Sequence, residues 1–129
     1  MALTTYLGNK LLDHAIGKTA YVLPAPYVAL FTVAPTIAGG GTECLYTGYT
    51  RISAPALFGA AASLSSTNTS AIIFPAKTAG TDETVAYWAT FDASTAGNML
   101  EFGTITASKL IQNGDIPSFA ISALTRTVS

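Results

Sequence analysis

The first seventeen residues show the only clear helical spacing of apolar positions in the chain. They place leucine or isoleucine along one stripe, at Leu3, Leu7, Leu11, Leu12 and Ile16, and this spacing is typical of an amphipathic helix. Thr4 or Thr5 can cap its start, and Gly17 suits the left-handed residue that often follows a helix. The pattern predicts a helix over about residues 4–16. Because so short a helix is marginal alone, we expect it to dock on something.

After Gly17 the period changes to that of β-strands. Short segments rich in β-branched and aromatic residues are separated by Pro, Gly, Asn and Asp. Seven strands are predicted: Tyr27–Thr32, Tyr49–Ser53, Ala71–Phe74, Val85–Phe91, Met99–Ile105, Phe119–Ser122 and Leu124–Val128. In Val85–Phe91 simple alternation predicts that Val85, Tyr87, Ala89 and Phe91 share one face. Both faces of this strand are mostly apolar, so we expect it to be covered on both sides.

Turn signals connect these strands directly. The stretch 94–98 predicts a turn that lets Met99–Ile105 return antiparallel to Val85–Phe91, and Asn113–Asp115 predicts a second turn. No helical pattern recurs between the strands, which disfavours a parallel βαβ fold. The predicted fold is therefore all-β, an antiparallel β-sandwich or jelly roll of about seven or eight strands. We expect one domain over 1–129, with an N-terminal helical arm (1–17) and a β-sandwich (18–129).

One long stretch, Val33–Gly48, fits neither pattern. It has three consecutive glycines near its middle and also carries Ile37, Cys44, Leu45 and Tyr46. Because loops normally run over the surface, these apolar side chains must either fold back onto the core or face a partner. The sequence leaves both possibilities open.

The composition is unusually poor in charge. Half of the 129 residues are hydrophobic and 10% are charged, against roughly 25% in an average soluble domain. Six basic and seven acidic residues give a formal net charge of −1, and the basic residues are scattered. A nucleic-acid-binding or membrane-surface role is disfavoured, since each needs clustered cations. A nearly neutral apolar domain is prone to self-association.

Candidate catalytic chemistry is sparse. His14, the only histidine, lies beside Asp13 on the predicted helix, where adjacent side chains point in different directions. The seven carboxylates show no convincing pairing, and the glycine run lacks the Lys-Ser or Lys-Thr of a phosphate-binding loop. Cys44 is alone, so neither a disulfide framework nor a cysteine–histidine metal site is predicted. We expect no enzyme activity, no cofactor and no bound metal.

The aromatic residues are the remaining candidates for a functional surface. Six Phe suit the core, whereas Tyr and Trp suit either a core or an interface. Together with apolar residues of the helix and of the long stretch, they give the predicted interface: Leu3, Tyr6, Leu7, Ile37, Leu45, Tyr46, Tyr49 and Trp88.

The order of short motifs along the whole chain resembles a family of small tailed-phage virion proteins. The resemblance is carried by segments 7–14, 27–32 with Pro35, 40–43, 48–51, 72–76, 85–93, 97–100, 113–115 and 123–125. Members of this group are described as tail-fibre or capsid proteins, and some resemble the jelly-roll cement proteins that decorate phage heads. The resemblance carries no catalytic motif.

The resemblance implies a virion structural role. Its first interpretation is a capsid decoration (cement) protein, made in the host cytoplasm and bound to the outer surface of the phage head. Its expected partners are then the major capsid protein and copies of itself, as a homodimer or homotrimer, without nucleic acid or membrane. The alternative is a tail-fibre or receptor-binding module. Virion copy number and location distinguish the two interpretations.

Overall fold

The computed structural model describes residues 1–128, which form one short helix and ten strands. The helix is α1 (Thr5–Ala15). The strands are β1 (Ala2–Leu3), β2 (Tyr27–Val33), β3 (Thr42–Glu43), β4 (Ile52–Ser53), β5 (Ser65–Thr67), β6 (Ile72–Ile73), β7 (Glu83–Phe91), β8 (Met99–Ile111), β9 (Ser118–Phe119) and β10 (Thr125–Thr127).

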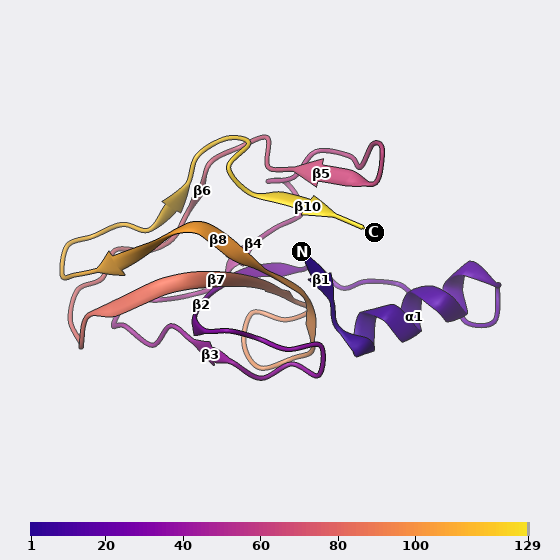
Figure 1. Ribbon diagram of the computed structural model, residues 1–129, viewed down its shortest axis with the longest axis horizontal. Helices are drawn as coiled ribbons and strands as arrows, with labels where there is room; N and C mark the ends of the chain where they lie inside the picture. Colours follow the sequence, from indigo (N-terminus) through magenta and orange to yellow (C-terminus); the bar gives the residue numbers. More distant parts are fainter. Residues whose placement is uncertain (129) are drawn as a thin grey trace.

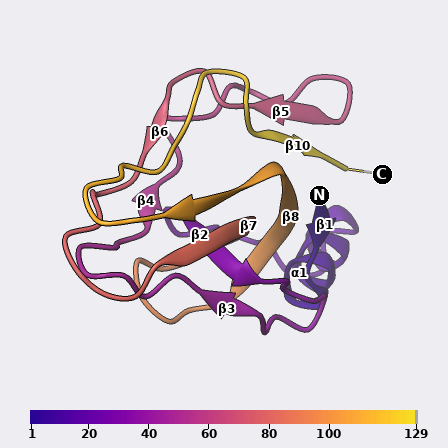
Figure 2. The same ribbon diagram turned by 60° about the vertical axis from the view of Figure 1, so that its left-hand side comes forward.

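The strands form two layers. The main sheet has the order β1-β8-β7-β2-β3, and β4 pairs with the start of β2. Two small ladders, β5 with β10 and β6 with β9, lie over one side of this sheet (Figures 1 and 2). Strand pairing is antiparallel throughout the described residues. The predicted all-β sandwich is confirmed.

The main core lies between the two layers. Val28 and Leu30 of β2 and Trp88 of β7 point into it, where they meet Ile72 and Phe74 beneath the small ladders. The opposite face of the main sheet carries a second buried cluster around Phe31 and Phe91, whose rings stack with centroids 6.0 Å apart. The central strands are therefore covered on both sides, as was expected for Val85–Phe91.

One predicted strand face is wrong. Simple alternation grouped Val85 with Tyr87, but the pairing of β7 with β8 shifts register between these two residues. The irregularity turns Val85 to the main core beside Trp88, while Tyr87 packs on the second cluster. A β-bulge adds one residue and so reverses the alternation beyond it.

The N-terminal helix agrees closely with the sequence pattern. Thr4 is the N-cap and its side chain accepts a hydrogen bond from the backbone N–H of Leu7. Gly17 has a φ of +72°, the left-handed conformation expected after a helix. The helix ends within one residue of each predicted boundary.

The strand boundaries agree less well. β2, β7 and β8 were predicted, although β8 runs on to Ile111, but Tyr49–Ser53 shortens to the two residues of β4. β1, β3 and β5 were missed. Each has only two or three residues and pairs with a strand far away in the sequence or across a loop.

Candidate interaction surface

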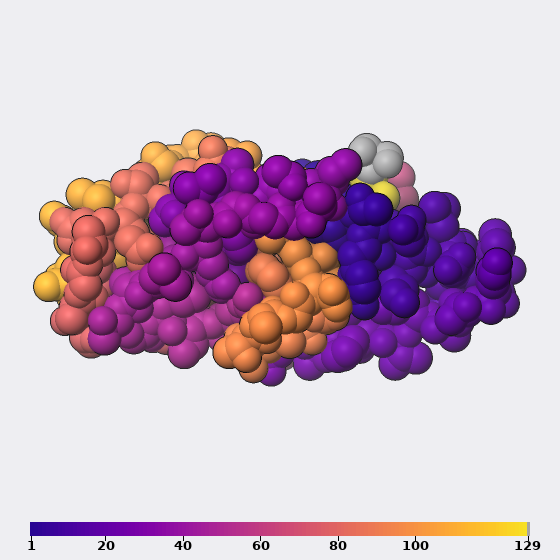
Figure 3. Space-filling view, turned by 90° about the horizontal axis from the view of Figure 1, so that it is seen from below, coloured from indigo at the N-terminus to yellow at the C-terminus, as the bar shows by residue number. Residues whose placement is uncertain are grey.

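The helix α1 projects from one end of the sandwich. Figures 1 and 3 show α1 and the segment that returns from it extending well beyond the β layers. We call residues 4–23 the arm. Its return segment is tied to the helix by a hydrogen bond from the backbone N–H of Tyr21 to Nδ1 of His14, 3.0 Å long. The side chain of His14 therefore serves as a hydrogen-bond acceptor for the backbone of the return segment.

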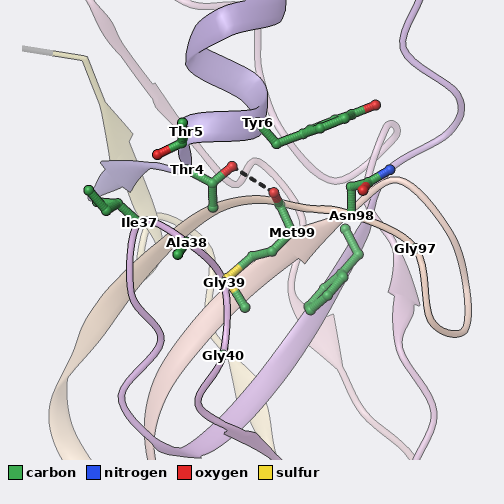
Figure 4. Close-up of a pocket in the computed structure, with 11 residues that line it drawn as sticks. Thr4, Thr5, Tyr6, Ile37, Ala38, Gly39, Gly40, Gly97, Asn98 and Met99 are labelled. Carbon is green, nitrogen blue, oxygen red and sulfur yellow. Dashed lines mark hydrogen bonds between the residues drawn. The ribbon is translucent and has the colours of Figure 1, made fainter.

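The base of the arm is fixed firmly to the main sheet. The buried Thr4 hydroxyl lies 2.6 Å from the carbonyl oxygen of Met99, to which it donates, and its backbone N–H donates to Leu100 at 2.9 Å. The N–H of Thr5 donates to the carbonyl of Ile37 at 2.8 Å. These bonds enclose a cleft of about 350 Å³ between the start of α1, the glycine loop and the turn before β8 (Figure 4).

Beyond its base, the arm leaves its apolar face uncovered. Leu7 is the one buried residue of α1. Further along the same stripe Leu11 is 40% exposed, Leu12 69% and Ile16 78%, and Val22 on the return segment is 85% exposed. These four residues form the arm patch. A helix with an apolar stripe normally buries it against another element, and here the chain itself covers only the first turn.

Gly8 belongs to this uncovered face. A helical wheel places it between Leu11 and Leu12, and a Cβ built on it would meet no atom within 4 Å. A glycine in a helix interior costs about 1 kcal/mol relative to alanine. Nothing within residues 1–128 explains the glycine. A second element that approaches the helix closely at this point would explain it.

The long stretch 33–48 divides its apolar residues between inside and outside. Cys44 and Tyr46 are 1% and 4% exposed and lie in the main core, whereas Ile37 and Leu45 are 61% and 82% exposed. The alternation follows from the extended backbone around β3, in which successive side chains point to opposite sides. Burial raises the pKa of the Cys44 thiol to about 12 and that of Tyr46 to about 12.

A buried ionic clamp fixes the second face of the main sheet. Arg51 donates from Nε and Nη2 to the two oxygens of Glu43, each bond 2.8 Å long. Its Nη1 donates to the carbonyls of Ala93 and Ala96, at 3.0 and 2.8 Å, and the guanidinium carbon lies 3.7 Å from the centroid of the Phe91 ring. The clamp joins β3, the residue that precedes β4, and the 92–98 loop over the Phe91 cluster.

Tyr49 completes the clamp from the core side. Its hydroxyl donates to Glu43 at 2.7 Å and accepts from the N–H of Leu30 at 3.1 Å. Burial, reinforced by the hydrogen bond to Glu43, raises the pKa of Tyr49 far above its ordinary value, so the phenol stays protonated in the folded protein.

The predicted interface residues are only partly brought together. Tyr6 and Ile37 line the cleft at the base of the arm. Close by, Leu3 of β1 pairs with Glu101 of β8 in the main sheet. Leu45 is exposed elsewhere, with its N–H bonded to the carboxylate of Glu83.

The other four predicted interface residues lie inside the fold. Leu7, Tyr46 and Trp88 are buried, and Tyr49 is largely enclosed by Glu43 and Phe74. These four side chains therefore pack inside the single chain, and a role for them at an interface stays a prediction. Apolar and aromatic side chains serve a core and an interface equally well, so the sequence could not separate the two.

The predicted interface did not include the four exposed apolar residues of the arm patch, which are Leu11, Leu12, Ile16 and Val22. The helical stripe already contained the first three. The missing information was which turn of the helix the β-sandwich would cover. The structure shows that it covers only the first.

The described residues offer little material for catalysis. Within 1–128 no group of three or more His, Cys, Asp or Glu side chains is placed to hold a metal ion. None of the described helical segments is both long enough and apolar enough to cross a membrane. What distinguishes the surface is the projecting arm with its uncovered apolar side chains.

Comparison with known protein families identifies the class of protein. The model of a family described as podophage GP4 fiber I protein gp80 matches residues 2–127. The chain belongs to this family. The fiber I family is one of phage virion structural proteins, so the predicted virion structural role is confirmed. A search of curated proteins found no match.

The family description also bears on the two interpretations left open by the sequence. It names a fibre protein, which fits the tail-fibre alternative better than the capsid cement interpretation. Membership of the fiber I family therefore does not support the cement role or the location on the outer head surface that was expected first.

Proposed function

We propose that this protein is a structural subunit of a phage fibre, assembled into the virion through its arm. The observation that carries the proposal is the match of the fibre family over nearly the whole chain. A rigid sandwich buried on both faces of its main sheet suits a load-bearing subunit. The arm supplies a contact surface, so that subunits can associate without covering the sandwich.

The arm patch is best covered by the arms of other copies of the same chain. The exposed fractions of its four side chains add up to nearly three fully exposed residues. Burying an aliphatic side chain contributes about 1.5–3 kcal/mol, so each arm can contribute roughly 4–8 kcal/mol. Association costs about 4–15 kcal/mol, which two or more arms together can offset. Every copy brings the same patch, so a closed symmetric contact forms naturally.

The low charge of the chain supports self-association. The net charge is −1, so copies repel one another little. On α1 itself the charged residues Lys10 and Asp13 lie on the side of the wheel opposite to Gly8, whereas His14 lies about 60° from Leu11, next to the buried Leu7. The apolar side is thus free of charges that would have to be desolvated when two arms meet.

The location of the protein in the virion tests the fibre role. Purified virions carrying an epitope after the C-terminus would be labelled with immunogold and their protein copies counted by quantitative mass spectrometry. We expect gold at discrete fibres and a copy number far below that of the major capsid protein. Gold spread over the head, with hundreds of copies that follow the capsid lattice, would instead establish the cement role and overturn the proposal.

The oligomeric state tests the role of the arm separately. In sedimentation equilibrium the wild-type chain is expected to form a closed oligomer. The variant Leu12→Gln/Ile16→Gln should be monomeric with an unchanged fold. The matched control Ile73→Gln/Ile121→Gln changes two isoleucines of the sandwich that are 58% and 63% exposed, and it should remain oligomeric. A monomeric wild-type chain would refute self-association through the arm.

A further inference from the structure

A buried lysine that the proposed function does not use lies at the end of the molecule opposite to the arm. Lys77 belongs to the loop between β6 and β7, and its side chain is 0% exposed. This loop meets the turn after β8, at the end of the sandwich farthest from α1 (Figure 1). The N–H of Lys77 donates to the carbonyl of Asp115 at 2.9 Å, and the N–H of Gly114 donates to the carbonyl of Lys77 at 2.7 Å. These two bonds hold the lysine at a fixed place beside the turn.

The side-chain nitrogen of Lys77 contacts the side-chain amide of Asn113. Nζ lies 2.5 Å from Oδ1 of Asn113, closer than the roughly 2.7–3.2 Å of an ordinary N–H···O bond. Nζ also donates to the carbonyl of Gly80 at 2.8 Å, and a carboxylate oxygen of Asp82 is 3.7 Å away, beyond hydrogen-bonding distance. A buried ammonium is costly unless a carboxylate is hydrogen-bonded to it. An ion pair therefore explains this lysine poorly.

The contact places a nucleophile against an amide carbon. Because a C=O bond is about 1.2 Å long, Cγ of Asn113 lies at most about 3.7 Å from Nζ. Two groups held about 3–3.5 Å apart are in position to react. The competing nucleophile for an asparagine side chain is the backbone nitrogen of the next residue, and here the N–H of Gly114 is bonded to the carbonyl of Lys77. Nζ is thus the nitrogen best placed to attack Asn113.

We propose that Lys77 and Asn113 form an intramolecular isopeptide bond. Nζ attacks Cγ of Asn113, a new C–N bond forms, and the bond from Cγ to the amide nitrogen Nδ2 breaks. Two of the three protons of the lysine ammonium pass by way of Asp82 to Nδ2, which leaves as an ammonium ion. The reaction needs no oxidant and no second substrate. The N–H that remains on Nζ keeps its hydrogen bond to the carbonyl of Gly80.

Asp82 is placed to carry these protons. Its side chain is 48% exposed, so rotation of the carboxylate can close the 3.7 Å gap to Nζ. The amide of Gln112, the residue before Asn113, lies 3.4 Å from the second oxygen of Asp82 and keeps the carboxylate close to the turn. Asn113 is exposed, so the released ammonium ion escapes to solvent. The reaction also removes the charge of Lys77, which gives a reason for a lysine with no exposed side chain.

The bond closes a loop that contains the two longest strands of the main sheet, β7 and β8. The linked residues are 36 positions apart. A covalent link across such a loop restricts the unfolded chain and so stabilises the folded one. A fibre subunit that must resist mechanical load gains from this link, but the proposal goes beyond the fibre role and does not depend on it.

The mass of the full chain tests the proposal directly. Intact-mass spectrometry of the denatured wild-type protein should give the mass of its residues less one ammonia molecule. Trypsin should leave fragment 52–109 joined to fragment 110–126, since it does not cleave after an acylated lysine. A wild-type chain of full mass would overturn the proposal. A deficit of one ammonia without joined fragments would also overturn it, because a succinimide of Asn113 and Gly114 gives the same deficit.

Three variants test the roles of the side chains. Lys77→Arg keeps a positive charge but removes the amine, so its chain should have full mass and be cleaved after position 77. Asp82→Asn removes the proton carrier and should lower the linked fraction by about tenfold or more. The matched control Glu83→Gln changes the neighbouring carboxylate and should stay fully linked. Joined fragments in Lys77→Arg or wild-type linkage in Asp82→Asn would contradict the mechanism, and the wild-type measurement stands whether or not either variant folds.

Discussion

The clamp formed by Arg51 and Glu43 makes a quantitative prediction about stability. The side chain of Arg51 is 7% exposed and that of Glu43 is 23% exposed. The perturbation is Arg51→Met, which keeps an apolar stem over the Phe91 ring but removes every donor. Glu43 then keeps only the hydroxyl of Tyr49 as a side-chain partner, and the carbonyls of Ala93 and Ala96 lose theirs.

The expected loss follows from the number of bonds and their burial. Removing one partner of a buried ion pair costs about 3–5 kcal/mol. Because Glu43 is about one quarter exposed and retains one hydrogen bond, we expect about 3 kcal/mol, at the low end of that range. For a chain of this length the loss corresponds to a fall in Tm of roughly 10 °C. Arg51→Lys should recover little, since an ammonium cannot make the two-pronged contact.

The assay is urea unfolding followed by the fluorescence of Trp88, the single tryptophan, which is buried in the main core. A double-mutant cycle with Glu43→Gln isolates the coupling between the two side chains. Lys109→Met, at an exposed position of β8, is the control and should change the free energy of unfolding by less than about 0.5 kcal/mol. A loss below about 1 kcal/mol for Arg51→Met, or zero coupling in the cycle, would refute this account of the clamp.

Three further predictions concern the arm, the core and the C-terminal strand. Gly8→Ala should raise the Tm of the isolated chain, because alanine favours the helix by about 1 kcal/mol, but it should weaken the oligomer in sedimentation; an oligomer of unchanged affinity would contradict close helix contact at Gly8. The raised pKa values of Cys44, to about 12, and of Tyr49 mean that both groups ionise first in the unfolded chain. Stability is therefore fully present below about pH 9 and falls as pH rises from there toward 12; urea unfolding at pH 8 to 11 would detect this, and a stability that stays constant over that range would exclude it. Asn68→Ala should cost about 3 kcal/mol, because the buried Asn68 amide bonds to three backbone groups, at 2.8 to 2.9 Å, including the N–H of Leu124; a loss below about 1 kcal/mol in the same urea assay would count against it.

The helix and the long strands could be predicted because the residues that specify each of them are close together in the sequence. The helix was predicted because its apolar stripe, its capping threonine and the glycine after it all lie within seventeen residues. The strands β2 and β7 were predicted because most of their residues are β-branched or aromatic. These elements make up the frame of the main sheet.

The parts that were missed depend on contacts between distant segments. The strand β5 consists of two serines and a threonine, with no apolar alternation, and it exists because it pairs with β10 about sixty residues later. The bulge in β7 also has no local signal, since it follows from the register against β8. Pairing of this kind is decided by the folded chain as a whole.

The candidate interface was predicted only in outline. Helical periodicity identified an apolar stripe but could not show that the sandwich covers Leu7 and leaves Leu12 and Ile16 exposed. The same limit applies to Trp88, which fills the core instead of an interface. Burial is a property of the whole fold, so a residue type alone does not reveal which side chains remain at the surface.

The most direct test of the central claim is the number of copies of this chain in virions that carry the arm variant Leu12→Gln/Ile16→Gln, measured by quantitative mass spectrometry. The account predicts that copies per virion fall at least tenfold, while Ile73→Gln/Ile121→Gln virions keep the wild-type number. Wild-type incorporation of the arm variant would contradict assembly through the arm.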